Sequence, residues 1–439
     1  MWGAIDVGMV CAGYVLGLVF AGLGWGGWVV GKMLPLWLAQ TAPILRPRPD
    51  RGEHSLSGHG TSPGVVVVLG GGFGGVRVAR SLGSMYDVIL VDDKAGWEFT
   101  PSIPRIAAEP GALSDIAVPH ASHGLFRFVQ GRAVGVGSHC VSVASAEEGG
   151  EMVELEFDYL VVATGARYAE LVSGPNALPC WRGREVGEAG DAMARGEVRD
   201  VVVVGGGIVG VELAAELVET YPDVGVVLAH SGDRLMSASP SVTVRAAEYA
   251  ERFLSSRGVR LALGERVVEV DRRGERIVLG SLASETEFEA DMVFVATGIV
   301  PNTEFLRVGA GKTPSPFDGT LDARGFVQTT HALNLPDHPH IFVLGDILAR
   351  PGEKLAQVAE AQADVVAANI SRLERGRSSD ALRTHVSSPV PIIVSLGKYD
   401  GLLLFRGWTL PGTIAALGKA FVERLSVAMY RNSASSYLF

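Results

Sequence analysis

The chain has 439 residues with a formal net charge of −10, and 47% of its residues are hydrophobic. This length allows two or three domains with a large core, and the acidic balance without a basic run argues against a nucleic-acid partner. The three cysteines, Cys11, Cys140 and Cys180, form no Cys-x-x-C motif. We therefore expect neither a disulfide framework nor a redox-active dithiol.

The chain opens with an uncharged apolar stretch, residues 7–31. It is long enough to cross a bilayer as a helix, and Trp2 and Trp28 near its ends suit the membrane interface. The first six residues lack the positive charge of a secretory signal. We expect a retained N-terminal hydrophobic helix, although its many glycines leave a shallow hairpin at the membrane surface open. Residues 40–63 are interpreted as a linker.

The charges around this stretch predict an orientation. Asp6 is the only charge before it, whereas Lys32, Arg46, Arg48 and Arg51 follow it. By the positive-inside tendency, a membrane-associated chain of this kind places its later domains on the cytoplasmic or matrix-like side.

The first glycine-rich turn follows a strand of four valines at residues 65–69. Gly70, Gly72 and Gly75 fit the G-x-G-x-x-G spacing, in which the glycines allow a tight turn, a close approach of backbone to a pyrophosphate, and close packing of helix on strand. A second strand ends in Asp92, whose carboxylate can accept hydrogen bonds from a ribose. The complete turn comprises Gly70, Gly71, Gly72, Phe73, Gly74 and Gly75.

The same pattern occurs twice along the chain. Residues 157–163 form a strand that runs into Ala163, Thr164 and Gly165. A second fingerprint then follows at Gly205, Gly207 and Gly210, its second strand ends in His230, and another Ala-Thr-Gly strand ends at Gly298. This internal repeat predicts two dinucleotide sites.

The last third of the chain holds a further strand that ends in Gly345 and Asp346. A helix is expected over residues 354–371. Asp346 can bind sugar hydroxyls, and the alternative is a helix cap. Beyond it we expect a hairpin at 392–405 and an amphipathic tail at 415–430, which either packs on the domain or meets a membrane or a partner.

The order of these motifs resembles the two-dinucleotide-binding flavoprotein reductases of the pyridine nucleotide-disulphide oxidoreductase type over residues 65–405. Within them it is similar to the apoptosis-inducing-factor-like branch, which includes the ferroptosis suppressor proteins, and to type II NADH dehydrogenases. The resemblance implies FAD in the first domain, NADH or NADPH in the second, and a quinone-type acceptor. It also implies that Arg105 and the backbone of Ala133 lie near FAD.

The cofactor assignments follow from these motifs. The first turn would hold the FAD pyrophosphate, with Asp92 on the adenosine ribose and Asp346 on the ribityl chain. The second turn would hold the nicotinamide nucleotide. Because no acid ends the strand at His230, Ser231 and Arg234 can receive a 2′-phosphate, although Asp233 opposes it, and we expect NADPH to be used beside NADH.

The catalytic candidates are Glu212, Glu216 and Lys354. Glu212 lies just past the last fingerprint glycine and is expected to border the flavin, while a solvated helix face is a plausible alternative for Glu216. Lys354 or Lys398 is expected to line the approach of the acceptor. No metal site is expected.

The sequence thus predicts an α/β chain with two Rossmann-like dinucleotide-binding domains, a small C-terminal α+β region and the N-terminal helix. The expected domains are an anchor and linker at 1–63, an FAD-binding domain at 64–190 and 311–380, an NAD(P)H-binding domain at 191–310, and a C-terminal region at 381–439. Two alternatives to a quinone reductase stay open: a ferredoxin-type reductase, and a nucleotide-sensing interaction protein like apoptosis-inducing factor. A homodimer is also left open.

Overall fold

The computed structural model describes residues 64–146, 150–169, 172, 176–180, 182–311 and 313–431, which all belong to one unit, Ser62–Ala434. The expected anchor and linker at 1–63 therefore lie outside the described residues. Within those ranges, no helix is long and apolar enough to cross a bilayer.

The first glycine-rich segment lies in a seven-stranded sheet of order β19-β8-β1-β2-β5-β6-β7. Its core strands are parallel: β1 forms parallel pairs with β2 and β8, and β8 forms a parallel pair with β19. Strands buried on both faces need continuous apolar runs, which the valines of β1 supply. The strands are β1 (Val65–Leu69), β2 (Asp87–Asp92), β5 (Arg127–Val136), β6 (Cys140–Ser145), β7 (Met152–Glu156), β8 (Tyr159–Val162) and β19 (Ile341–Val343).

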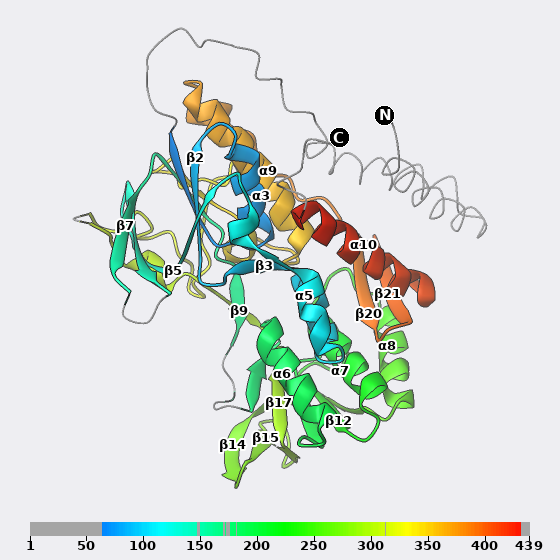
Figure 1. Ribbon diagram of the computed structural model, residues 1–439. Coiled ribbons are helices and arrows are strands. Elements are labelled where there is room, and N and C mark those ends of the chain that lie inside the picture. Colours follow the sequence, from blue (N-terminus) through cyan, green and yellow to red (C-terminus); the bar gives the residue numbers. More distant parts are fainter. Residues whose placement is uncertain are drawn as a thin grey trace, which may run out of the picture. The chain divides into compact units, whose positions relative to one another are not determined.

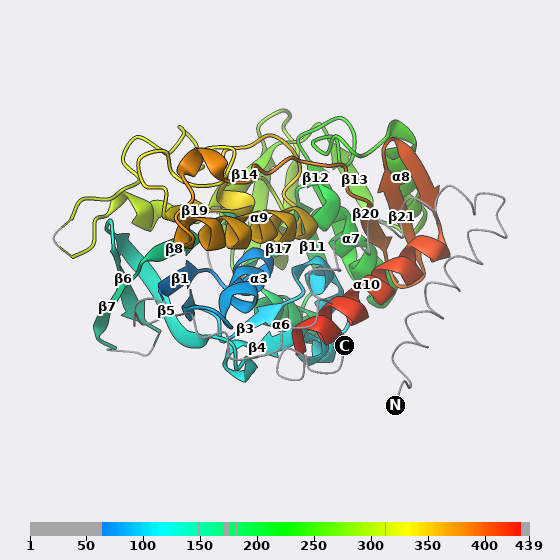
Figure 2. The same cartoon turned by 90° about the horizontal axis from the view of Figure 1, so that it is seen from above.

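Two helices, α3 (Phe73–Leu82) and α9 (Ala356–Glu374), lie side by side on this sheet (Figure 1 and Figure 2). An ion pair of 2.7 Å between Arg77 and Asp364 joins them. The helix expected at 354–371 is therefore present, but it begins and ends slightly later. Because β19 pairs with β8, the segment around residue 341 belongs to the same sheet as the first glycine-rich segment. The bounds of the FAD-binding and NAD(P)H-binding domains stay a prediction.

The second fingerprint lies in a five-stranded parallel sheet of order β10-β17-β11-β12-β13. Its strands are β10 (Ala177–Pro179), β11 (Asp200–Val204), β12 (Gly225–His230), β13 (Arg260–Leu263) and β17 (Met292–Val295). A separate antiparallel sheet is formed by β14 (Val267–Arg273), β15 (Arg276–Ser281) and β16 (Glu287–Ala290). The helices of this region are α6 (Gly183–Ala194), α7 (Ile208–Thr220) and α8 (Val244–Ser256).

The expected hairpin and tail form a C-terminal layer. Strands β20 (Ile392–Leu396), β21 (Asp400–Phe405) and β22 (Trp408–Pro411) make an antiparallel sheet that α10 (Thr413–Arg431) covers (Figure 1). The Tyr430 ring stacks on Trp97 with 3.8 Å between centroids, and its hydroxyl donates to the Phe73 carbonyl at 3.2 Å. One face of the tail therefore packs on the domain, which is the first of the two alternatives given for residues 415–430.

The remaining elements are short. They are β3 (Gly96–Glu98), β4 (Ala117–Pro119), β9 (Ala166–Tyr168), β18 (Ile299–Pro301), α4 (Ile103–Ile106) and α5 (Leu113–Ile116), together with several 3₁₀ turns. The antiparallel pair β9 and β18 connects the segments that follow the two Ala-Thr-Gly strands.

Candidate FAD and nicotinamide sites

The first glycine-rich turn has the geometry that a pyrophosphate requires. Gly70 has φ +99°, and a Cβ there would lie 2.3 Å from the Ala163 carbonyl oxygen, so only glycine fits. A Cβ on Gly75 would lie 1.8 Å from the Gly70 carbonyl oxygen, which explains the third glycine. Gly72, at the N-terminus of α3, differs because a Cβ there would meet no atom within 4 Å and no side chain caps the helix. This open space at a helix N-terminus fits an anionic pyrophosphate.

Asp92 lies beside this turn, as the sequence predicts. Its carboxylate accepts hydrogen bonds from the backbone N–H of Gly71 and, at 2.7 Å, from that of Lys94. Burial raises the pKa of Asp92 to about 6, against the opposing effect of these hydrogen bonds. The carboxylate is thus fixed in place at the end of β2, where an adenosine ribose would lie.

His120 lies beside the first glycine turn and is a candidate site residue that the sequence analysis missed. Both of its ring nitrogens are buried without a hydrogen-bond partner, and a Cβ on Gly71 would lie 2.4 Å from its Nε2. Burial lowers the pKa of His120 to about 3, so the ring is neutral at physiological pH. An unsatisfied polar group next to the glycine turn fits a bound nucleotide. No motif surrounds His120, so only the fold reveals it.

The two residues that the resemblance placed near FAD have different surroundings. Ala133 pairs with Val143 on β6, shortly after the residue of β5 that pairs with Asp92. The Arg105 guanidinium forms ion pairs with Glu109 at 3.3 Å and with Glu423 of α10 at 2.9 Å. Arg105 is therefore held by acidic side chains, and its role toward FAD remains a proposal.

The second turn has the same steric requirements for glycine as the first. Gly205 has φ +113°, and its Cβ would lie 2.3 Å from the Ala296 carbonyl oxygen, while a Cβ on Gly210 would lie 1.9 Å from the Gly205 carbonyl oxygen. At Gly207, as at Gly72, a Cβ would meet nothing within 4 Å. This turn, too, leaves space for a pyrophosphate at the N-terminus of α7.

His230 occupies the place in the second turn that Asp92 has in the first. A Cβ on Gly206 would lie 2.8 Å from the His230 Cγ. Nearby, the Nε of Arg234 is buried without a hydrogen-bond partner. The end of β12 thus presents a histidine and an arginine, with no carboxylate at the position where an acid would bind the ribose.

The first Ala-Thr-Gly segment contacts the residues that follow the second one. Thr164 Oγ1 donates to the Asn302 carbonyl at 2.8 Å, and Asn302 Nδ2 donates to the Thr164 carbonyl at 2.9 Å. Gly298 directly precedes β18, which pairs with β9. These contacts bring the ends of the two halves together.

Tyr168 on β9 marks a junction between the two halves. Burial raises the pKa of its phenol, and the thiol of Cys180 and the carboxylates of Glu212 and Asp346 raise it further. Glu212 lies on α7, which follows the second glycine turn, and Asp346 follows β19 in the sheet of the first turn, so the fold brings both candidates close to one side chain. Burial raises the pKa of Cys180 as well, which keeps this thiol neutral.

The two glutamates of α7 are both buried, with exposed fractions of 3% for Glu212 and 6% for Glu216. The suggestion that Glu216 belongs to a solvated helix face is therefore wrong, because β20 and α4 pack against α7 and Lys419 of α10 reaches Glu212 on the same helix. Glu212 accepts hydrogen bonds from the backbone and hydroxyl of Ser395 and from Lys419. Burial raises the pKa of Glu216 to about 7.

A cavity of about 580 Å³ opens beside Asp346, and Lys354 lines it. Lys354 Nζ donates to the Leu348 carbonyl at 2.7 Å, and burial lowers the pKa of Lys354. The Thr329 hydroxyl, which also faces this cavity, is buried without a partner. Lys398 is 62% exposed and pairs with Glu109, so the structure does not bring the two candidate lysines together.

Comparison with known proteins agrees with this geometry. Ferroptosis suppressor protein 1 of Xenopus laevis is 26% identical over 366 residues, covering 81% of this chain and 92% of the relative. The sulfide:quinone oxidoreductase of Aquifex aeolicus superposes with a TM-score of 0.70 at 20% identity, covering 84% of this chain and 92% of that one. NDH2 of Plasmodium falciparum, solved in complex with NADH, superposes with a TM-score of 0.69 at 12% identity, covering 86% and 98%.

The family model of the pyridine nucleotide-disulphide oxidoreductases matches residues 64–363, which include both glycine-rich turns and Asp346. The protein is accordingly an oxidoreductase that uses FAD and NAD(P)H, with two dinucleotide-binding halves of the Rossmann type. The chain belongs to the pyridine nucleotide-disulphide oxidoreductase family.

Proposed function

We propose that this protein is an FAD-dependent NAD(P)H:quinone oxidoreductase, which passes two electrons from the nicotinamide through the flavin to a ubiquinone- or vitamin-K-like acceptor. The observation that carries the proposal is the composition of the junction around Tyr168. Its only thiol among the described residues is Cys180, which is buried and neutral. With no dithiol to receive electrons, the acceptor must come from outside the chain.

The relatives support the same class of acceptor. The name of the Aquifex neighbour includes a quinone, and the curated relatives include ferroptosis suppressor proteins. Bound FAD would take a hydride from the nicotinamide and release the electrons to the acceptor. The role of the protein is to position the two cofactors. Asp346 and Asp92 bind the flavin nucleotide, and the two glycine-rich turns hold the two cofactors so that their reactive rings meet at the junction around Tyr168.

We assign Lys354 to the acceptor side. Burial raises the pKa of the Asp346 carboxyl, the positive charge of Lys354 opposes this rise, and Lys354 lines the cavity beside that residue. An ammonium there can donate to a carbonyl oxygen that gains negative charge during reduction. Glu212 and Glu216 lie on the nicotinamide side, where we propose that Glu212 borders the flavin.

Steady-state kinetics test this function directly. NADH and NADPH oxidation is measured with a short-chain ubiquinone, menadione, dissolved oxygen and a ferredoxin-type carrier as separate acceptors. We expect the quinones to give the highest kcat/KM, with one quinol formed per nicotinamide oxidised. Turnover with the carrier alone would indicate a ferredoxin-type reductase, and nucleotide binding without turnover would indicate a sensing protein; either result contradicts the proposal.

We further propose that residues 7–31 attach the enzyme to a membrane, where a long-chain quinone is dissolved. Every cofactor motif begins at Val65 or later. Deletion of residues 1–52 is therefore expected to leave FAD binding and short-chain quinone reduction intact, while reduction of long-chain quinone in vesicles falls. Tight membrane binding of the truncated protein would instead place the attachment elsewhere, for instance on α10.

A further inference from the structure

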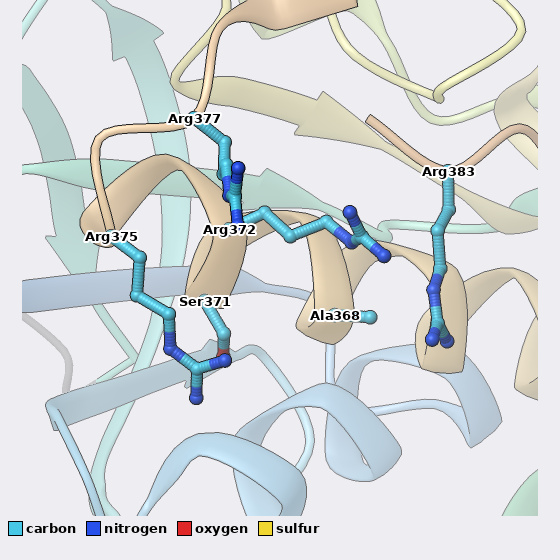
Figure 3. A pocket seen from close by; sticks show the side chains of 6 residues that line it. All are labelled: Ala368, Ser371, Arg372, Arg375, Arg377 and Arg383. Carbon is cyan, nitrogen blue, oxygen red and sulfur yellow. The ribbon is translucent and has the colours of Figure 1, made fainter. Parts of the chain in front are cut away.

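A hollow of about 310 Å³ at the end of α9 is lined by four arginines. Its lining residues are Ala368, Ser371, Arg372, Arg375, Arg377 and Arg383. Figure 3 shows Arg372 reaching from the helix toward the segment that carries Arg383, while Arg375 and Arg377 extend from the turn that follows the helix. The hollow thus collects guanidinium groups from a helix end and from two points of the chain beyond it.

This hollow is separate from the dinucleotide sites. α9 begins beside the Gly345 turn, where Gln362 accepts a hydrogen bond from the Gly345 N–H, and it ends at Glu374. At a rise of 1.5 Å per residue its 19 residues span about 28 Å. Glu374 accepts a hydrogen bond from Tyr159, the first residue of β8, at 3.0 Å. The arginines therefore lie at the N-terminal edge of the parallel sheet, opposite the edge that holds the glycine turns.

The four positive charges have no acidic partner. Throughout the described ranges, no carboxylate forms an ion pair with Arg372, Arg375, Arg377 or Arg383. Arg372 donates one hydrogen bond to the Ala381 carbonyl at 3.2 Å, and the carboxylate of Glu374 is bound to Tyr159. This concentration of unpaired cations contrasts with the net charge of −10 of the whole chain.

The helix dipole accounts for only part of this cluster. Cations near the C-terminus of a helix are stabilised by its partial negative charge, which suits Arg372 and Arg375. Arg377 and Arg383 lie beyond α9, outside the last turn to which this effect is confined. Their convergence on the same hollow needs a different explanation.

We propose that the hollow binds a phosphate-bearing ligand, either a soluble phosphate compound or the headgroup of an anionic lipid. The planar guanidinium fork matches the geometry of phosphate oxygens and can bind them with two parallel hydrogen bonds. The volume of about 310 Å³ suits a phosphoryl group with a small substituent, and is roughly half of the 580 Å³ of the cavity beside Asp346. The site adds an anion-binding function that is remote from the electron-transfer centre.

The test is calorimetric titration of the full chain, loaded with FAD, in a neutral detergent with excess NAD⁺ so that both dinucleotide sites are filled. The probes are pyrophosphate, dihexanoyl-phosphatidic acid, and dihexanoyl-phosphatidylcholine as a zwitterionic lipid of the same chain length. The test variant is Arg377→Gln/Arg383→Gln, since neither of these side chains forms a hydrogen bond or ion pair in the described structure. The matched control is Arg245→Gln/Arg252→Gln on α8, which removes the same charge from an exposed helix face.

We expect an anionic probe to bind and the test variant to weaken its binding by at least about tenfold, with the control variant unchanged. Pyrophosphate binding would identify a soluble source, and binding of phosphatidic acid alone would identify a lipid headgroup. The proposal is overturned if neither anionic probe binds, if phosphatidylcholine binds as well as phosphatidic acid, or if both double variants lose binding equally.

Discussion

The Lys419 ammonium contacts the buried carboxylate of Glu212, joining α10 to the helix that opens at the second glycine turn. Ser395 of β20 completes this group by donating its backbone N–H to the same carboxylate at 2.8 Å. Three segments far apart in the sequence thus share one carboxylate at the junction. The C-terminal layer thereby fixes the position of a candidate catalytic residue.

Replacing Lys419 with Met tests this link. The change leaves the Glu212 carboxylate buried without its cation, and we expect the free energy of unfolding to fall by about 3–5 kcal/mol. The double variant Lys419→Met/Glu212→Gln should lose less, because it buries no unpaired charge. Urea denaturation followed by circular dichroism measures both. Lys398→Met, which removes an exposed ion pair, serves as the control and should have little effect. Equal losses in the Lys419 and Lys398 variants would show that the link is unimportant.

Gly72→Val separates cofactor binding from folding. A Cβ at Gly72 would meet no protein atom within 4 Å, so the chain should fold, but the added carbons enter the space proposed for the FAD pyrophosphate. We expect a colourless protein with normal secondary structure by circular dichroism. The control is Gly111→Ala, where a Cβ also meets no atom within 4 Å but which lies outside both glycine turns. A yellow Gly72→Val protein with full FAD content would refute the assignment of this turn.

Stability should depend on pH through Glu216. Burial raises its pKa from 4.5 to about 7. Below pH 4.5 the carboxyl is protonated in both folded and unfolded chains, whereas between pH 4.5 and 7 only the unfolded chain loses the proton. The free energy of unfolding should therefore fall across this window, by about 3 kcal/mol at most.

Glu216→Gln removes this dependence. Relative to the wild type, the variant should gain stability as the pH rises from 4.5 to 7 and keep that gain above pH 7. Thermal unfolding at a series of pH values measures the difference, with Glu248→Gln on α8 as an exposed control. A constant gap between the Glu216 variant and the wild type at every pH would contradict the raised pKa.

Arg234 is expected to set the preference between the two nicotinamide nucleotides. Its buried Nε lacks a partner, and a 2′-phosphate could supply one. Arg234→Ala should raise the KM for NADPH by about tenfold, the usual value of one charge-assisted hydrogen bond, and leave the KM for NADH nearly unchanged. Steady-state oxidation of each nucleotide with menadione measures this, and Arg245→Ala is the control. Strict use of NADH by the wild type would remove the basis of the prediction.

The residue types alone were enough to predict the two glycine turns, their strands and their order. Gly70 and Gly205 need a positive φ, and Gly75 and Gly210 need the absence of a Cβ, so these local requirements are visible in the residue types. The strand ends at Asp92 and His230, and the turn with Asp346 that follows β19, could be placed as well, since a parallel strand feeding a helix brings its carboxyl end to the ligand edge.

Which polar side chains are buried, and which groups they contact, depends on how the chain packs in three dimensions. Glu216 and an exposed acid on a helix look alike in sequence, and the packing of β20 and α4 on α7 makes the difference. His120 lies beside the first glycine turn although it belongs to a short 3₁₀ turn and no sequence motif surrounds it. The four arginines at the end of α9 likewise share a hollow only because the chain turns back after the helix. Burial and proximity depend on contacts between distant segments, so neither periodicity nor spacing can report them.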